Sequence, residues 1–209
     1  MFSGLLRTVD KLNSKPSVAL TVVLLCLALA ACDLAQNRSS GFNAIDITGA
    51  DYGKDFRLSD ASGKTRTLAD FRGKAVLLFF GFTHCPDVCP TTLADAAKVV
   101  KTLGADGERV QVLFVTLDPK RDTPAVLAQY IPAFHPGFVG LYGDEATTRK
   151  TAKDFRIFYE QRPGSTPDSY SIDHTAATLV FDPQGRLRLF VNNGMAPDKI
   201  AADIRKLLL

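Results

Sequence analysis

Two cysteines separated by three residues, Cys85 and Cys89, are the residues best suited to chemistry in this sequence. The other two of its four cysteines, Cys26 and Cys32, belong to a hydrophobic N-terminal segment. A thiolate acts as a nucleophile, a disulfide partner or a ligand for a soft metal ion. The pair therefore predicts metal binding or thiol redox chemistry, and the alternative without chemistry is a structural disulfide.

The elements on either side of the pair place it in a loop between a strand and a helix. An uninterrupted apolar run over residues 76–80 precedes it and predicts a buried strand. After Pro90 the apolar residues recur at helical spacing over 93–103, and proline is favoured at the first position of a helix. We therefore expect Cys89 to cap this helix at its positive end, where a thiolate is stabilised.

Residues 1–31 have the composition of a secretion signal, with basic residues, an apolar core over 18–30 and then small residues. The core is shorter than the about 20 apolar residues that span a bilayer. Leu29-Ala30-Ala31-Cys32 resembles a bacterial lipobox, in which cleavage precedes the cysteine and that cysteine carries lipid. We expect Cys32 to be lipidated. An ordinary signal peptide or an uncleaved anchor helix is the alternative.

The remaining chain divides into a tether and one domain. Residues 32–50 are mostly polar and predict a flexible tether, and residues 51–209 have the length of a single domain with a sizeable core. Lys and Arg total 25 against 22 Asp and Glu, and they form no basic patch. This balance gives no sign of a nucleic-acid partner, and we take the domain to be a monomer.

The domain alternates strand and helix signals, which predicts an α/β fold with a mixed central sheet flanked by helices. An N-terminal β-hairpin is expected from 56–58 and 65–68, and a Pro/Gly/Ser-rich loop over 161–171. The other expected strands are 74–82, 110–117, 138–142, 178–181 and 187–191, and the expected helices are 90–103, 123–134, 145–158 and 197–208.

Three separated motifs together resemble the Sco/SenC family of the thioredoxin superfamily. They are GFTHCPDVCP over 81–90, LDPKRDTP over 117–124, and Asp173-His174-Thr175 ahead of DPQG over 182–185. The resemblance implies a thioredoxin-like fold and a copper ion bound by Cys85, Cys89 and His174. It also implies a copper chaperone that assists assembly of the copper centre of cytochrome c oxidase. With the lipid anchor expected at Cys32, this chaperone would be tethered to a bacterial cell membrane and would face the periplasm. Its partner would be the copper-bearing subunit of cytochrome c oxidase or another copper protein.

The implied ligand set agrees with coordination chemistry. Two thiolates and an imidazole suit Cu(I) or Cu(II), whereas a closed structural zinc site usually has a fourth protein ligand. The alternative function is an enzyme-like one, a thiol-disulfide reductase that uses Cys85 and Cys89 and is indifferent to His174. Three residues between the cysteines, and a histidine where thioredoxin-like oxidoreductases have proline, favour the metal.

Four other polar residues near these motifs have a simpler interpretation beside the functional one. His84 is expected to point away from the cysteines, because neighbouring extended residues face opposite sides. Asp87 and Asp118 either shape the site or serve as ordinary turn residues, and Asp118 could also meet a partner. His135 is expected to cap a helix end or to face solvent.

Overall fold

The computed structural model describes residues 41–165 and 169–209. Residues from Phe42 to Leu209 form one compact unit. The expected secretion signal and Cys32 lie outside the described residues. In the part of the chain that is described, no helix combines the length and the apolar character needed to cross a membrane.

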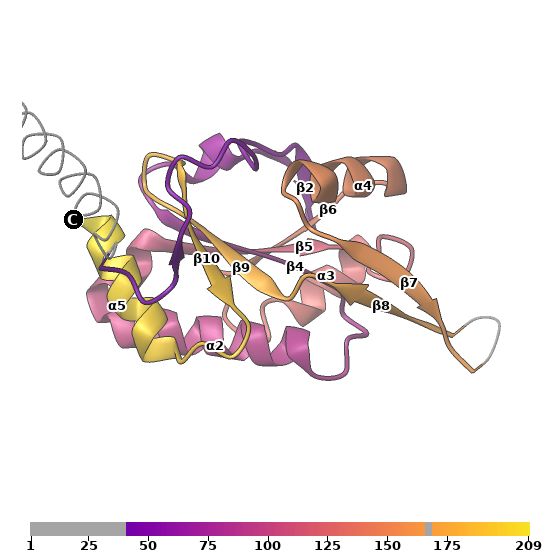
Figure 1. The fold of residues 1–209 in the computed structure, drawn as a ribbon. Helices are drawn as coiled ribbons and strands as arrows, with labels where there is room; N and C mark the ends of the chain where they lie inside the picture. The colour runs from indigo at the N-terminus through magenta and orange to yellow at the C-terminus, as the bar shows by residue number, and fades with distance from the viewer. Residues whose placement is uncertain (1–40, 166–168) are drawn as a thin grey trace, which may run out of the picture. The chain divides into compact units, whose positions relative to one another are not determined.

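A mixed eight-stranded sheet, in the order β1-β10-β9-β4-β5-β6-β2-β3, runs through the domain (Figure 1). Strands β4, β5 and β6 are parallel, and β9 pairs with β4 in the antiparallel sense. The strands are β1 (Ile45–Asp46), β2 (Leu58–Asp60), β3 (Thr65–Arg66), β4 (Ala75–Gly81), β5 (Val110–Thr116), β6 (Val139–Tyr142), β9 (Ala177–Phe181) and β10 (Leu187–Asn192).

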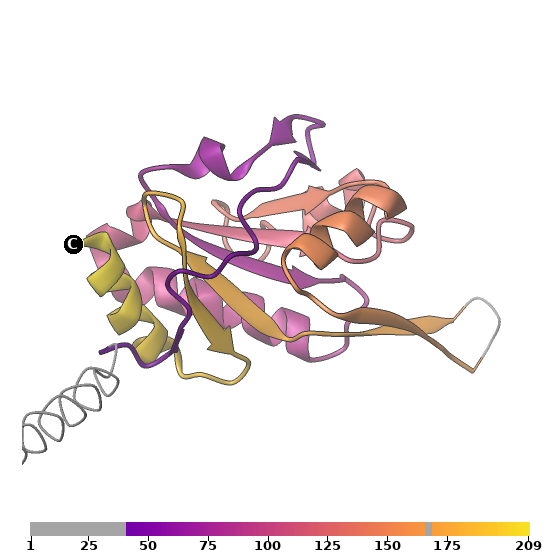
Figure 2. The ribbon, with the colours of Figure 1, turned by 45° about the horizontal axis from the view of Figure 1, so that its top comes forward.

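Helices cover both faces of this sheet (Figure 2). One face carries α2 (Val88–Leu103), α3 (Pro124–Tyr130) and α5 (Pro197–Leu208). The other carries α4 (Glu145–Asp154) and the short helix η1 (Leu68–Phe71), and a second short helix, η2 (Gly104–Arg109), joins α2 to β5.

Each face has its own core. We call the first the α2-side core, which includes Leu77, Phe79, Cys89, Leu93, Phe114, Leu127 and Ile204, and the second the α4-side core, which includes Val76, Leu78, Phe80, Leu113, Ala152 and Phe155. Successive residues of β4 alternate between the two. Because both faces of β4 are covered, its sequence is continuously apolar, as in other buried parallel strands.

A two-stranded hairpin projects from the domain (Figure 1). It consists of β7 (Tyr159–Pro163) and β8 (Tyr170–His174), which pair with Tyr159 opposite His174. The expected loop over 161–171 is therefore wrong at both its ends. The Pro/Gly/Ser composition indicated a loop, but the segment forms a two-stranded ribbon. Its backbone pairing is regular while most of its side chains are exposed.

The expected α/β thioredoxin-like fold and its N-terminal hairpin are confirmed, with three local differences. The hairpin β2–β3 joins the main sheet through β6. Helices α3 and α4 each end four residues earlier than expected. Within the segment expected to be a tether, β1 pairs with β10, and the backbone N–H groups of Asn43 and Ala44 donate to the buried carboxylate of Asp203.

Candidate metal centre

Strand β4 delivers the cysteine pair to the start of α2. The helix begins at Val88 with Asp87 as its N-cap, so the expectation that Cys89 is the cap and Pro90 the first residue is wrong by two positions. Pro90 still lies in the first turn, where backbone N–H groups have no intrahelical acceptor, so the proline removes no helical hydrogen bond. Cys89 thereby enters the α2-side core. Asp87 is the N-cap by position, but its side chain makes no capping hydrogen bond to the backbone and contacts the Thr91 hydroxyl, at 3.4 Å.

The two thiols differ in burial. Cys89 is 0% exposed, Cys85 is partly exposed, and neither is in a disulfide. The backbone N–H of Cys89 donates to the Cys85 sulfur at 3.4 Å, so the loop turns back and brings the two cysteines together. Burial raises the pKa of the Cys89 thiol, and the nearby Cys85 and Asp122 add to the effect. This thiol therefore keeps its proton until a cation takes the proton's place, so the expected stabilisation of its thiolate by the helix end is outweighed by burial.

His174, the last residue of β8, completes the group. Its Nε2 lies 3.5 Å from the Cys89 sulfur, and its Nδ1 lies 3.1 Å from the backbone oxygen of Thr175. A carbonyl oxygen only accepts, so Nδ1 carries the hydrogen and the Nε2 lone pair faces the cysteines. Burial lowers the pKa of His174, which keeps the imidazole neutral and able to coordinate.

Aromatic rings fix the orientation of this imidazole. The rings of Phe79 and Phe82 both meet it edge-on, with centroids 6.0 Å away. As a result the ligand atoms of Cys85, Cys89 and His174 all lie within 4.8 Å of one another. The structure thus brings together the three residues that the sequence motifs singled out.

Gly81 allows the cysteine to pack this closely against the sheet. A Cβ atom at this position would lie 2.9 Å from the Cys89 sulfur and equally close to the rings of Phe79 and Phe114. Such contacts are shorter than packed side chains tolerate. The glycine at the end of β4 is therefore required by the approach of α2 and not by its backbone conformation.

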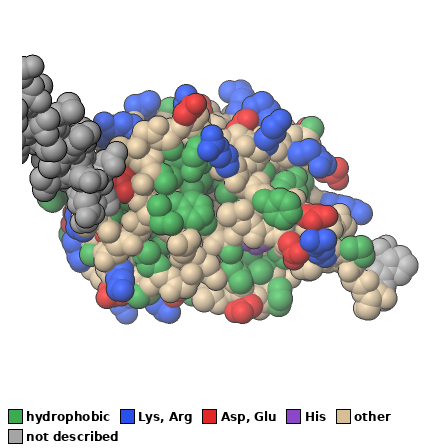
Figure 3. Space-filling model, in the orientation of Figure 1, with side chains coloured by type: hydrophobic (Ala, Val, Ile, Leu, Met, Phe, Trp, Pro, Cys, Tyr) green, Lys and Arg blue, Asp and Glu red, His purple; other side chains and the backbone are tan. Residues whose placement is uncertain are grey.

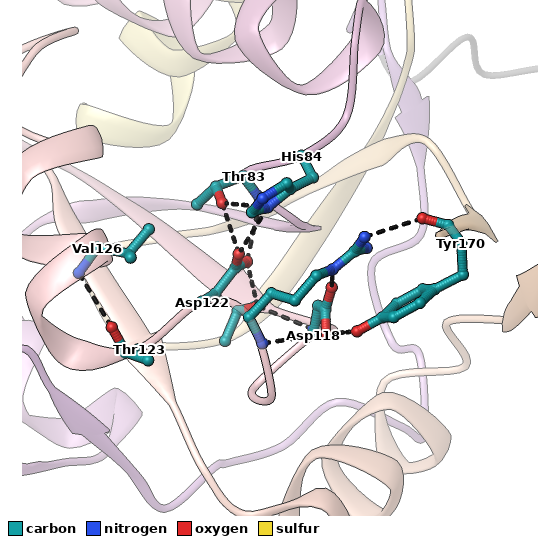
Figure 4. A network of polar contacts seen from close by, with 9 residues as sticks. Thr83, His84, Asp118, Asp122, Thr123, Val126 and Tyr170 are labelled. Carbon is teal, nitrogen blue, oxygen red and sulfur yellow. Dashed lines mark hydrogen bonds and ion pairs between the residues drawn. The ribbon is translucent and has the colours of Figure 1, made fainter. Parts of the chain in front are cut away.

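The carboxylate of Asp122 holds the cysteine loop in place (Figure 4). It accepts hydrogen bonds from the backbone N–H of Thr83 at 3.0 Å and from the Thr83 hydroxyl at 2.6 Å. It also accepts from the hydroxyl of Thr116, at the end of β5, at 2.6 Å. His84 contacts Thr83 and Asp122 with its ring and stays outside the ligand group, as expected.

A second network ties the hairpin to the same segment (Figure 4). The guanidinium of Arg121 pairs with the buried carboxylate of Asp118, donates to the backbone oxygen of Tyr170 at 2.9 Å and stacks on its ring at 3.5 Å. The Tyr170 hydroxyl donates to Asp118 at 2.8 Å. Asp118 therefore positions β8, which carries His174, beyond any role in its own turn.

Sequence reasoning missed Thr83 and Tyr170. Thr83 lies inside the cysteine motif, and this position could have marked it as a residue of the site. Tyr170 had none, because its partner Arg121 is 49 residues away and nothing local marks the contact. His135 accepts a hydrogen bond from the backbone N–H of Gly137 at 3.1 Å. Because α3 already ends at Tyr130, His135 closes a turn and does not cap a helix end as expected.

The group opens to solvent on one side. Cys85 and His174 are both partly exposed, while Cys89 lies beneath them. Figure 3 shows a histidine side chain among hydrophobic ones near the base of the projecting hairpin. Two sulfur donors and one imidazole with one open side suit a soft or borderline metal ion that can enter and leave.

Comparison with known proteins places the chain in a family. The SCO1/SenC family model matches residues 46–209. The structure is similar to Bradyrhizobium japonicum ScoI with copper bound (38% identity, 75% of this chain and 99% of that one, TM-score 0.69) and to apo Sco1 from Thermus thermophilus (41% identity, 81% and 99%, TM-score 0.70).

Curated relatives extend the similarity to longer proteins. The mitochondrial SCO2 homolog of Bos taurus is 38% identical over 154 residues, which is 73% of this chain and 58% of that protein. The corresponding human protein is 36% identical over 154 residues, again 58% of its length. The chain thus spans about three fifths of these relatives. Both the family match and these identities show that the chain belongs to the SCO1/SenC family.

Proposed function

We propose that this chain binds one copper ion, Cu(I) or Cu(II), through Cys85, Cys89 and His174 and hands it to another copper protein. The observation that carries the proposal is the convergence of the three ligand atoms within 4.8 Å. Relatives described as copper-bound, from Bradyrhizobium japonicum and from yeast, support the choice of metal.

The fold contributes to this function by holding the two sulfurs and one nitrogen close enough together to bind one ion. Loading requires both thiols to be reduced and displaces the proton that burial retains on Cys89. Three protein ligands leave a coordination position open on the exposed side. Release then proceeds by ligand exchange, in which an incoming thiol or imidazole of the acceptor replaces one ligand at a time.

The acceptor we propose is the copper-bearing subunit of cytochrome c oxidase, which the family resemblance implies. We further propose that the chain is a lipoprotein of a bacterial cell membrane, facing the periplasm. The support is the small residues that precede Cys32 after an apolar core. Mass spectrometry of the mature N-terminus tests this anchor, because a lipidated Cys32 adds acyl mass that Cys32→Ala cannot carry.

Copper stoichiometry of the full chain, reduced and purified in detergent, tests the ligands. We expect one copper per chain and a thiolate-to-Cu(II) absorption band. The matched control is the double variant Cys85→Ser, Cys89→Ser, which keeps the rest of the chain, including His174, and so reports any copper held elsewhere. Equal copper in the two proteins would contradict the proposal.

A thiol-disulfide reductase is the second candidate. It is favoured by the free thiols and by the contact of the Cys89 N–H with the Cys85 sulfur at 3.4 Å. In that function Cys85, the more exposed thiol, attacks a partner disulfide as its thiolate, and Cys89 resolves the mixed disulfide. The products are a reduced partner and a Cys85–Cys89 disulfide. Exchange that is lost without the cysteines but unchanged without His174 would favour this function.

A further inference from the structure

A cleft of about 530 Å³ lies beside the start of β10. Its walls come from residues 48–54 and 186–188. The backbone N–H of Ile47 donates to the Arg188 oxygen at 2.8 Å, so the two segments lie side by side (Figure 2). The charged residues of the lining are all cationic: Lys54, Arg186 and Arg188. The cleft therefore favours an anionic ligand.

A buried carboxylate holds two of these cations in place. Asp182, whose side chain is 1% exposed, accepts from Nε of Arg186 at 2.8 Å and from Nη1 of Arg188 at 3.1 Å. Nε of Arg188 also donates to the Thr48 hydroxyl at 2.7 Å. One carboxylate thus serves two guanidinium groups. This arrangement orients both side chains and leaves one positive charge uncompensated.

Neighbouring segments bring further positive charge to the cleft. Nη1 of Arg72 donates to the backbone oxygen of Gln184 at 3.3 Å, in the turn that leads into β10. The guanidinium of Arg156 lies 4.4 Å from the centroid of the Tyr52 ring, which lines the cleft. The fold thus assembles a basic surface from segments that are far apart in the sequence.

Lys54 adds an accessible ammonium group to the lining. It pairs with Asp51 at 3.5 Å, but both side chains are more than three quarters exposed, so solvent screens the pair. Arginine forks match the geometry of phosphate oxygens, and a lysine contributes a point charge to the same kind of ligand. The lining therefore indicates a phosphate-bearing ligand.

Strand β9 separates this cleft from the copper ligands. Leu187 pairs with Phe181 at one end of the strand, and Asn192 pairs with Ala177 at the other end, three residues after His174. A strand rises about 3.4 Å per residue, so these ends are about 14 Å apart. The cleft is therefore distinct from the metal centre.

We propose that this cleft binds the phosphate of an anionic lipid headgroup. The choice of a lipid over a free phosphate rests on the anchor proposed above. Residues 33–47 separate Cys32 from Thr48 and span at most about 55 Å when fully extended, so an anchor at Cys32 keeps the cleft within reach of the membrane surface. A basic surface held near a membrane is attracted to anionic headgroups.

The test compares the full chain in nanodiscs of phosphatidylcholine with the full chain in nanodiscs that also contain phosphatidylglycerol. The cleft variant is Lys54→Gln, Arg186→Gln. The matched control is Lys98→Gln, Arg109→Gln, which removes the same charge from pairs with Asp95 and Asp106 in α2 and η2. We expect phosphatidylglycerol to slow hydrogen exchange of the amides of 48–54 and 186–188 about fivefold in the parent chain and the control, and not in the cleft variant.

Two further measurements sharpen the test. Added salt should reduce the protection, because it screens the charges. Inorganic phosphate, added to the full chain in an uncharged detergent, is the probe for a free ligand. Protection by this phosphate with none from phosphatidylglycerol would overturn the lipid source. Equal protection of the parent chain and the cleft variant, or protection of neither, would overturn the whole inference. The mass measurement on Cys32 reports on the anchor separately, so the two failures are distinguishable.

Discussion

The cysteine loop and the β7–β8 hairpin supply the same site in opposite ways. The loop follows a strand that is buried along its whole length, and Cys89 is part of the α2-side core. The hairpin projects from the domain, and its side chains are mostly exposed (Figure 1). Packing therefore dominates at the cysteines, whereas the hairpin that carries the histidine combines packing of Ile172 and of the Phe79 and Phe82 rings with directed polar contacts.

This difference predicts that the two regions respond differently to substitution. The cysteine side cannot move without disturbing the core, while the hairpin depends on Arg121, Asp118 and Tyr170 for its attachment near the site. Substitutions on the cysteine side should therefore lower both the free energy of unfolding and the affinity for copper. Changes at the hairpin contacts should act more on the contribution of His174.

The largest expected effect comes from Gly81→Ala on the cysteine side. The added methyl group would stand 2.9 Å from the Cys89 sulfur and from two rings, so the core must shift. We expect a loss of about 3 kcal/mol in unfolding free energy and at least tenfold weaker copper binding, measured by urea unfolding and chelator competition. The control Gly137→Ala meets only the His135 ring, at 3.3 Å. Similar losses in both variants would contradict the packing argument.

A smaller effect is expected on the hairpin side from Arg121→Ala. The change leaves the Asp118 carboxylate, 4% exposed, without its cation, and removes the contacts to Tyr170. We expect a loss of about 2 kcal/mol in unfolding free energy, below the cost for a fully buried pair because Arg121 is 20% exposed.

Arg162→Ala is the matched control for the hairpin. Arg162 pairs with Asp173 at 2.8 Å, but both side chains are more than half exposed, so solvent screens the pair and it should contribute little to the free energy of unfolding. Hydrogen exchange of the β8 amides should rise in Arg121→Ala and hardly change in Arg162→Ala. Equal exchange in the two variants would show that the network does not hold the hairpin.

The smallest effect is an acid-dependent one in the scaffold, away from both regions. Burial opposes ionisation of Asp60 in β2, but hydrogen bonds from Ser62, Arg66 and Lys64 outweigh it and lower its pKa from 3.8 to about 2. The stability that this carboxylate contributes is complete above the unfolded-state pKa and is lost as the pH falls from about 4 to about 2.

Comparison with Asp60→Asn isolates that contribution. We expect the unfolding free energy of the parent chain to fall by about 1 to 2 kcal/mol more than that of the variant over this pH interval, followed by urea unfolding at each pH. Parallel curves for the two proteins would show that Asp60 does not carry the effect.

The same contrast between the regions explains what the sequence could predict. The apolar run of β4, the cysteine motif and the start of a helix are local signals, and they located the cysteine side to within two residues. The hairpin has no such signal, because residues such as Glu160, Gln161 and Arg162 face solvent on a ribbon held by backbone pairing. Its composition resembles that of a loop.

Contacts between distant residues were also beyond local reasoning. That His174 meets the cysteines was implied by family resemblance and not by spacing, and the structure confirms that the three ligand atoms meet. The contact of Tyr170 with Arg121, and the attachment of Asn43 and Ala44 to Asp203, depend on the folded arrangement of the sheet. Such contacts follow from topology, which a strand pattern alone leaves open.

His174, carried by the hairpin, is proposed as a copper ligand and not merely as a neighbour of two redox cysteines. The most direct measurement is copper binding of the reduced full chain beside its His174→Ala variant, with disulfide exchange followed in parallel. We predict that the variant loses the thiolate-to-Cu(II) band or binds copper at least tenfold more weakly. Copper binding that is unchanged in the variant would contradict the claim, and an unchanged exchange rate with no copper in either protein would favour the reductase.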